Sequence, residues 1–143
     1  MHAPYKAEEI AKFIVSHCWN EGAPVSHLEM QKILYFIQRD YLRQHNCPLF
    51  NEDFEAWQCG PVVPAAYNRF SMFVAYPIRR TYNISLSSED ETFIRDRIPE
   101  YRRKSPWEMV EDTHKPGSAW DRIWKAGKGY HQVIPQELIR IYG

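Results

Sequence analysis

The stretch of residues 51–70 is the feature that most constrains what this chain can fold into. Residues 54–58 alternate in the way of a short strand, and Cys59-Gly60-Pro61 ends that pattern. Gly60 adopts backbone angles closed to other residues, and Pro61 suits a first helical position, where the N–H it lacks would be unpaired. Apolar residues then recur at helical spacing, at Val62, Val63, Ala66, Tyr67 and Phe70. We therefore expect a strand, a glycine hinge and a helix that begins at Pro61.

Two helices are expected before this stretch. Residues 6–20 carry apolar side chains at three- and four-residue spacing, which predicts an amphipathic helix. Ser26 and Glu29 then have the spacing of a capping box, which predicts a second helix up to about residue 44. Because this helix has the longest regular apolar stripe in the sequence, we expect it to be the central helix of the core. The stripe comprises Met30, Ile33, Leu34, Ile37, Tyr41 and Leu42.

The second half of the chain contains several capping residues, each expected to begin a short helix, separated by residues that end helices. Residues 79–84 are interpreted as an edge strand that pairs with residues 54–58. Ser88 and Ser105 each stand three residues before a glutamate, so each is expected to cap a helix, the first kinked or ended by Pro99 and the second reaching residue 114. Ser118 is expected to cap a short helix. Residues 135–142 are expected to form a terminal helix that buries Leu138, Ile139 and Tyr142.

These elements predict the fold class mainly α (α+β). A chain of 143 residues with 44% hydrophobic residues is long enough to bury one core. We expect a single compact helical domain over residues 1–143, with about six to seven helices and a short element of two or three strands. The sequence has neither an internal repeat nor a linker that would separate two domains.

Charge and cysteine content narrow the function classes. The 18 basic residues are balanced by 18 acidic ones, so the chain lacks the basic excess that nucleic-acid binding normally requires, and we expect no nucleic acid as partner. Three cysteines without a Cys-x-x-Cys pair favour a reduced compartment. Neither a signal-peptide core nor an 18-residue apolar run is present, which predicts a cytoplasmic protein without a membrane partner.

Two kinds of chemical site are alternatives to a binding function. A cysteine-dependent hydrolase would use Cys59 as nucleophile, His114 as base and Asp112 to orient the imidazole. A zinc site would draw on Cys18, His45, Cys47 and Cys59, although their spacing is not that of a zinc knuckle. Because neither set has the motif spacing typical of its class, we expect no catalytic residues, no metal and no cofactor.

A DNA-binding regulator is the remaining alternative. Residues 6–20 and the helix after Ser26 would then form a helix-turn-helix. The connection of about six residues is longer than the usual three or four, and the zero net charge also disfavours this hypothesis.

Three motifs stand out in the sequence. The first is Met30-Gln31-Lys32-Ile33-Leu34-Tyr35 in the second helix. The second is Glu55-Ala56-Trp57, Gly60-Pro61-Val62, Pro64 and Tyr67. The third is Met109-Val110-Glu111-Asp112-Thr113-His114 with Ser118-Ala119-Trp120. With these motifs the sequence resembles the Panacea antitoxin domain family, which includes SocA-like and phage-associated GepA-like proteins, and the likeness extends from about residue 7 to residue 142.

This resemblance implies an antitoxin that neutralises a co-encoded toxin by direct protein contact. The cognate toxin is the expected partner, and an AAA+ protease and a second copy of the chain are further candidate partners. An indole beside a Gly-Pro hinge is a suitable interface anchor, and charged residues at its side suit an interface rim. The expected partner-binding residues are Glu55, Trp57, Gly60, Pro61, Val62, Tyr67, Arg69, His114 and Trp120.

Overall fold

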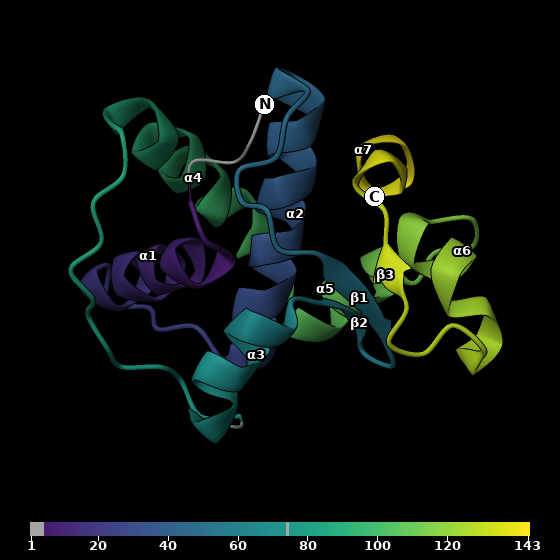
Figure 1. The fold of residues 1–143 in the computed structure, drawn as a ribbon. Helices are drawn as coiled ribbons and strands as arrows, with labels where there is room; N and C mark the ends of the chain where they lie inside the picture. Colours follow the sequence, from purple (N-terminus) through teal and green to yellow (C-terminus); the bar gives the residue numbers. More distant parts are fainter. Residues whose placement is uncertain (1–4, 74) are drawn as a thin grey trace.

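The computed structural model describes residues 5–73 and 75–143, and it is organised around one long helix. This helix is α2 (His27–His45), which stands upright at the centre of Figure 1. On one side of it lie α1 (Ala7–Asn20) and α4 (Ser88–Tyr101), and on the other lie the sheet, α6 (Ala119–Trp124) and α7 (Gln136–Tyr142). The expected mainly α fold, with seven helices and three short strands in the described part of the chain, is confirmed.

Helix α2 is central because it is buried on every face along its middle. Its start is the expected capping box, in which the Ser26 hydroxyl accepts from the Glu29 N–H, and it ends at Asn46 in the left-handed conformation. All residues from 30 to 38 are buried, including the polar Gln38. The Gln38 amide receives the N–H of Leu49 and donates to the carbonyl of Phe50, each at 2.9 Å, so it fixes the chain that leads from α2 to the sheet.

The sheet is antiparallel, with strand order β2-β1-β3. Strand β1 (Phe54–Trp57) pairs on one edge with β2 (Gly60–Val62) and on the other with β3 (Val133–Ile134). The first partner is a hairpin strand: Gly60 has φ +116, so the chain turns back at once and residues 60–62 lie against β1. The expectation that a helix begins at Pro61 was therefore wrong, because β2 comes first.

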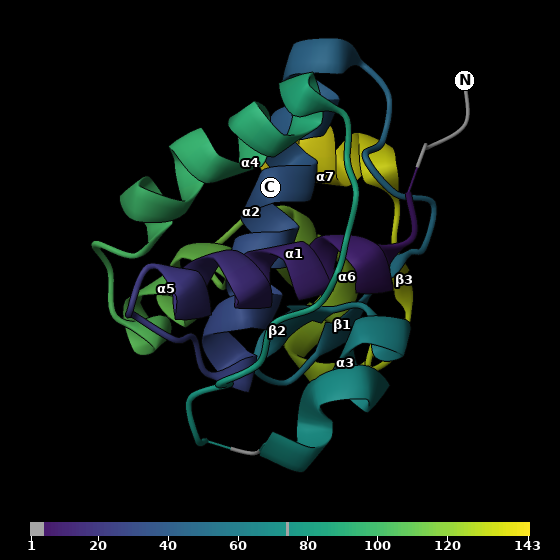
Figure 2. The same ribbon diagram turned by 90° about the vertical axis from the view of Figure 1, so that its left-hand side faces the viewer.

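The expected strand at residues 79–84 was also wrong. This segment is extended but joins no strand in the described chain, and it runs over α1 instead (Figure 2). Tyr82 N–H donates to the Ser16 hydroxyl at 2.7 Å, and Ile78 N–H donates to the Val25 carbonyl at 2.7 Å. The first of these hydrogen bonds holds the segment on α1, and the second fixes the residue just before it to the α1–α2 connection. The N–H of Tyr82 is therefore used there and not in the sheet.

The remaining helices follow the expected order with local shifts. Helix α3 (Pro64–Phe70) has Pro64 in its first turn, and the 3₁₀ turn η1 (Ser71–Phe73) follows it. Helix α4 is capped by Ser87, one residue before the predicted Ser88, and its last turn continues past Pro99 to Tyr101.

The C-terminal third contains α5 (Pro106–Thr113), α6, the 3₁₀ turn η2 (Lys125–Gly127) and α7. Ser105 and Ser118 cap α5 and α6 as expected. In α7, Ile139 is buried, but Tyr142 is 40% exposed and its ring lies 3.6 Å from the Arg122 guanidinium carbon. The expected burial of Tyr142 was thus wrong, because the last turn of α7 packs on a charged side chain. No helix in the described ranges is long and apolar enough to span a bilayer.

Candidate partner-binding site

A groove of about 800 Å³ opens between the start of α2, the β1–β2 hairpin and the start of α5. Aromatic rings form much of its wall, and the described residues that line it include two charged ones, Glu29 and Lys32. The groove is lined by Pro24, Ser26, His27, Leu28, Glu29, Gln31, Lys32, Trp57, Gln58, Cys59, Val62, Tyr67, Ser71, Ala75, Pro77, Pro106, Trp107 and Tyr130.

Trp57 forms one wall of this groove and is held by two neighbouring rings. Its ring contacts those of Tyr67 and His131, with centroid distances of 4.8 and 4.5 Å. The indole N–H donates to Glu55 Oε1 at 3.0 Å. Its main-chain carbonyl accepts from the Trp120 indole at 2.7 Å. The half-buried indole is therefore fixed in direction, as a pre-organised contact residue should be.

A second wall is built by a polar pair on α2. The His27 ring packs on Tyr67 at 4.8 Å, and its Nε2 lies 3.2 Å from the Gln31 side-chain amide. Burial, with a smaller contribution from the charge of Lys32, lowers the pKa of His27 to about 4, so the ring is neutral at pH 7. Gln31 is 2% exposed, and its Oε1 has no hydrogen-bond partner in the described chain. The groove wall thus carries a buried acceptor that a partner could satisfy.

Lys32 lies at the floor of the groove with no solvent-exposed surface. Its ammonium donates to the Pro61 carbonyl at 3.3 Å and belongs to no ion pair among the described residues. Burial lowers the pKa of Lys32 to about 7, although the nearby Cys59 thiol opposes that change. A buried amine without a carboxylate is uncommon, because desolvation of the charged form is uncompensated.

Gly60 and Thr113 close the space around this amine. A Cβ at position 60 would lie 2.8 Å from Lys32 Nζ and 2.9 Å from Thr113 Oγ1, so the hairpin requires a glycine for space as well as for its φ angle. The Thr113 hydroxyl donates to the Val110 carbonyl at 2.7 Å. The Lys32, Gly60 and Thr113 cluster therefore joins α2, β2 and α5 at one buried point.

His114 and Trp120 complete the layer beneath the groove. Their rings are stacked, with centroids 3.7 Å apart and planes inclined by 8°. His114 Nε2 is buried without a partner in the described chain. Burial and then the charge of Lys32 lower the pKa of His114. This ring is packed as a neutral aromatic group, and not as the cation that a helix C-terminus would favour.

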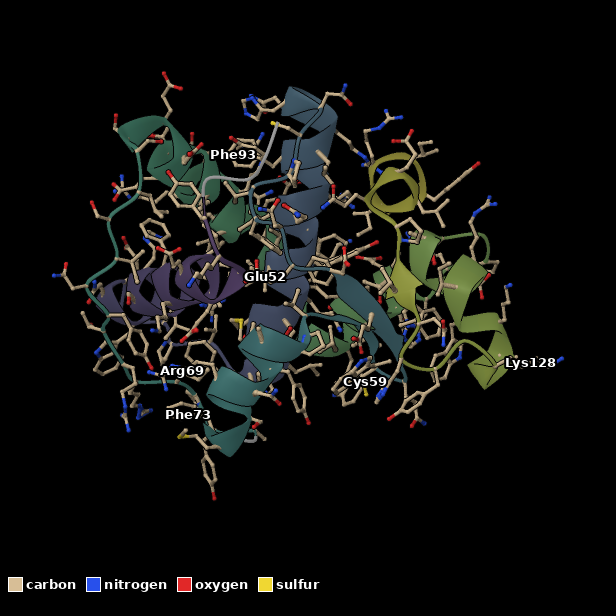
Figure 3. All side chains as sticks on the ribbon, viewed as in Figure 1. Glu52, Cys59, Arg69, Phe73, Phe93 and Lys128 are labelled. Atoms are coloured by element: carbon tan, nitrogen blue, oxygen red, sulfur yellow. The ribbon has the colours of Figure 1, made fainter. Side chains whose placement is uncertain are left out.

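The nine expected partner-binding residues fall into three groups. Three line the groove: Trp57, Val62 and Tyr67. Five support it from beside or below: Glu55, Gly60, Pro61, His114 and Trp120. Arg69 lies elsewhere, on the side of α3 toward α1 (Figure 3), where it pairs with Glu8 at 3.1 Å.

Most residues that line the groove were not among the expected ones, and the most informative of these are His27, Gln31, Lys32, Trp107 and Tyr130. Lys32 belongs to the first motif. Its place between Met30 and Ile33 of the apolar stripe is the one feature of the sequence that indicates burial. Trp107 and Tyr130 are 64% and 52% exposed. They belong to distant parts of the chain, so only the tertiary structure brings them to one groove.

The residues of the two alternative sites have other surroundings in the described chain. No hydrogen bond joins Cys59 to His114 in the described residues, and Asp112 is paired with Lys104 and Lys115. Cys18 is buried and Cys59 is exposed at the hairpin turn (Figure 3). Within residues 5–73 and 75–143, no three His, Cys, Asp or Glu side chains gather as a metal site.

The helix-turn-helix alternative requires an exposed second helix. A recognition helix enters the major groove with its N-terminal residues on base edges. In α2, Leu28 and Glu29 of the first turn are half-buried, and all residues from Met30 to Gln38 are buried. The packing of α2 as the central helix therefore disfavours the helix-turn-helix hypothesis.

The three motif segments thus meet in space as a small helical domain with a hairpin fixed on its central helix. The family described as "Antitoxin SocA-like, Panacea domain" matches residues 30–121, and this chain belongs to that family. Among characterised proteins, the chain is similar to the protein named Antitoxin SocA of Caulobacter vibrioides (strain NA1000 / CB15N). The two are 31% identical over 130 residues, which cover 82% of this chain and 69% of that protein. No solved structure matches the chain.

Proposed function

We propose that this protein is an antitoxin that neutralises a co-encoded toxin by binding it directly, and that the groove bounded by Trp57, Tyr67, Trp107 and Tyr130 is the contact surface. Membership of an antitoxin family supports the antitoxin role. The single observation that supports this location is the gathering of four rings around an open, largely apolar hollow. Large aromatic side chains in such hollows dominate binding energy at protein interfaces.

Trp107 and Tyr130 form the rim of the groove, and their exposure is more typical of a contact surface than of a core. Trp107 stands at the second position of α5 with 64% of its surface exposed, although an indole is among the side chains that gain most from burial. Tyr130 is 52% exposed on the facing segment. Covering these rings would remove apolar surface from water, which favours association.

Two further features of the proposed function concern what happens to the bound toxin and the compartment in which the protein acts. Delivery of the bound toxin to an AAA+ protease would add a second partner, and would reduce the amount of toxin as well as its activity. Pure sequestration would leave the amount unchanged. We further propose that the protein acts in the cytoplasm, since its three cysteines are free thiols.

The test is co-expression with the protein encoded by the adjacent gene. The wild-type chain should restore growth and co-purify with that protein, whereas Trp107→Ala should lose both because the rim anchor is gone. Trp19→Ala is the matched control, since Trp19 is a 39% exposed indole outside the groove. Equal loss in both variants, or no loss in Trp107→Ala, would contradict the groove as contact surface. Self-association that Trp107→Ala abolishes would instead identify a second copy of the chain as the occupant.

A further inference from the structure

The geometry points to a carboxylate side chain of the partner as the group that fills the floor of the groove, where it pairs with Lys32. This inference rests on the proposed function and deepens it. It concerns the chemistry of the partner's contact residue, an Asp or Glu that enters an aromatic-lined hollow.

The first support is the charge inventory of the groove. Its two charged residues are not equivalent: Glu29 is paired with Arg102, with the guanidinium Nε 3.1 Å from Oε2, whereas Lys32 has no carboxylate. Within the described chain, Lys32 donates to one main-chain oxygen, that of Pro61. An ammonium has three N–H donors, so two further bonds are open to an incoming carboxylate.

The second support is the set of titratable groups that face Lys32. They are His27 on its own helix, Cys59 in the hairpin turn and His114 at the end of α5. The charge of Lys32 disfavours the cationic form of both histidines, so neither can supply the missing negative charge. A carboxylate from a partner would compensate the desolvation of the charged amine, which burial alone drives toward the neutral form.

The third support is the position of the residues that precede Gly60. Gln58 and Cys59 are exposed and line the groove beside Lys32. Among the described residues, neither of these two side chains makes a hydrogen bond with the rest of the domain. On the preceding residue of α2, the buried Gln31 Oε1 has no partner in the described chain and would be available to an N–H group of the partner segment.

A coupling to pH follows from this pairing. In the free protein the pKa of Lys32 is lowered to about 7, and a paired carboxylate would raise it. Above pH 7 the complex therefore takes up a proton, and its affinity falls as pH rises, by at most tenfold per pH unit for one proton. Below pH 7 the amine is already charged, so affinity should change little until the partner's carboxylate is protonated.

The experiment is calorimetric titration of the full chain with the adjacent gene's product from pH 6 to pH 9. The Lys32→Met variant keeps most of the side-chain volume in the buried site and so should remain folded, which thermal unfolding checks. We expect it to bind at least tenfold more weakly at pH 6 and to lose the decline above pH 7. Lys128→Met is the matched control, because Lys128 lies exposed at the far end of the molecule (Figure 3).

The outcomes separate the two levels of the proposal. If Lys32→Met keeps the wild-type affinity and pH profile while Trp107→Ala loses binding, the pairing of a partner carboxylate with Lys32 is overturned. The groove would then still stand as the contact surface for the toxin. An affinity that rises with pH would also overturn the pairing, because the complex would then favour the neutral form of Lys32, and a carboxylate favours the charged form. Failure of the wild-type chain to bind at any pH would overturn the proposed function and this inference with it.

Discussion

The side-chain nitrogen of Lys32 lies directly beneath Gly60, so close that a Cβ on Gly60 would be only 2.8 Å from it. This relationship ties the central helix to the hairpin that bears Trp57. Both residues belong to the motif segments, and both are buried. The family motifs therefore build the frame of the groove, whereas much of its rim comes from other residues.

Gly60→Ala should destabilise the protein strongly. The substitution adds a clash with Lys32 and Thr113 to the strain of φ +116, and we expect it to cost about 3 kcal/mol. Gly22→Ala is the control: Gly22 has φ +75, but a Cβ there meets nothing within 4 Å, so only about 1 kcal/mol is expected. Urea unfolding measures both. Equal losses would show that the close approach to Lys32 has no energetic weight.

Stability should rise with pH above neutrality because of Lys32. The pKa of this amine is about 7 in the folded chain and 10.5 when unperturbed. Between pH 7 and pH 10.5 the unfolded chain therefore binds more protons than the folded chain, so unfolding becomes less favourable as pH increases. The free energy of unfolding should gain up to about 1.4 kcal/mol per pH unit from this group.

The measurement is the difference in unfolding free energy between wild type and Lys32→Met from pH 7 to 9.5. Taking the difference cancels the opposite effect of Cys18, whose pKa is raised by burial. A difference that does not change with pH would mean that Lys32 is charged throughout in the folded protein.

Acid should destabilise the protein through His27. Its pKa is lowered to about 4, below the unperturbed 6.5, so the unfolded chain binds the extra proton as pH falls between these values. The neutral ring therefore makes its full contribution to stability above pH 6.5, and this contribution is lost as the pH falls toward 4. His27→Gln, which keeps a polar partner for Gln31, should unfold with a weaker dependence on pH over this range. An unchanged slope in chemical unfolding curves would contradict the assignment.

Trp57→Ala should leave a folded but weakened protein. The indole is half-buried against Tyr67 and His131, so its loss should cost about 2 kcal/mol, less than for a fully buried ring. Trp57→Phe keeps a ring there and should cost less than half as much. Thermal unfolding and circular dichroism test this, and complete unfolding of Trp57→Ala would show that the ring is a core residue.

The sequence predicted the elements whose signals are local. Ser26, Ser105 and Ser118 cap helices through residues three positions away, so the pattern and the structure agree. The sheet was missed in part because its pairing is not local: β3 lies 76 residues after the end of β1, and residues 79–84 have strand-like composition but pack on α1.

The site was harder to predict than the fold. A lysine is normally assigned to the surface, and only its place inside an apolar stripe suggested that Lys32 could be buried. Trp107 and Tyr130 carry no pattern that distinguishes a rim from a core, since an aromatic residue suits both. Their role depends on three-dimensional proximity.

Alkylation of Cys59 measures occupation of the groove most directly. This exposed thiol lines the groove, whereas the half-buried Cys47 lies outside it and serves as internal control. In the complex with the adjacent gene's product, the alkylation rate of Cys59 should fall at least tenfold while that of Cys47 stays the same. An unchanged rate at Cys59 in a stable complex would contradict the claim that the partner binds in this groove.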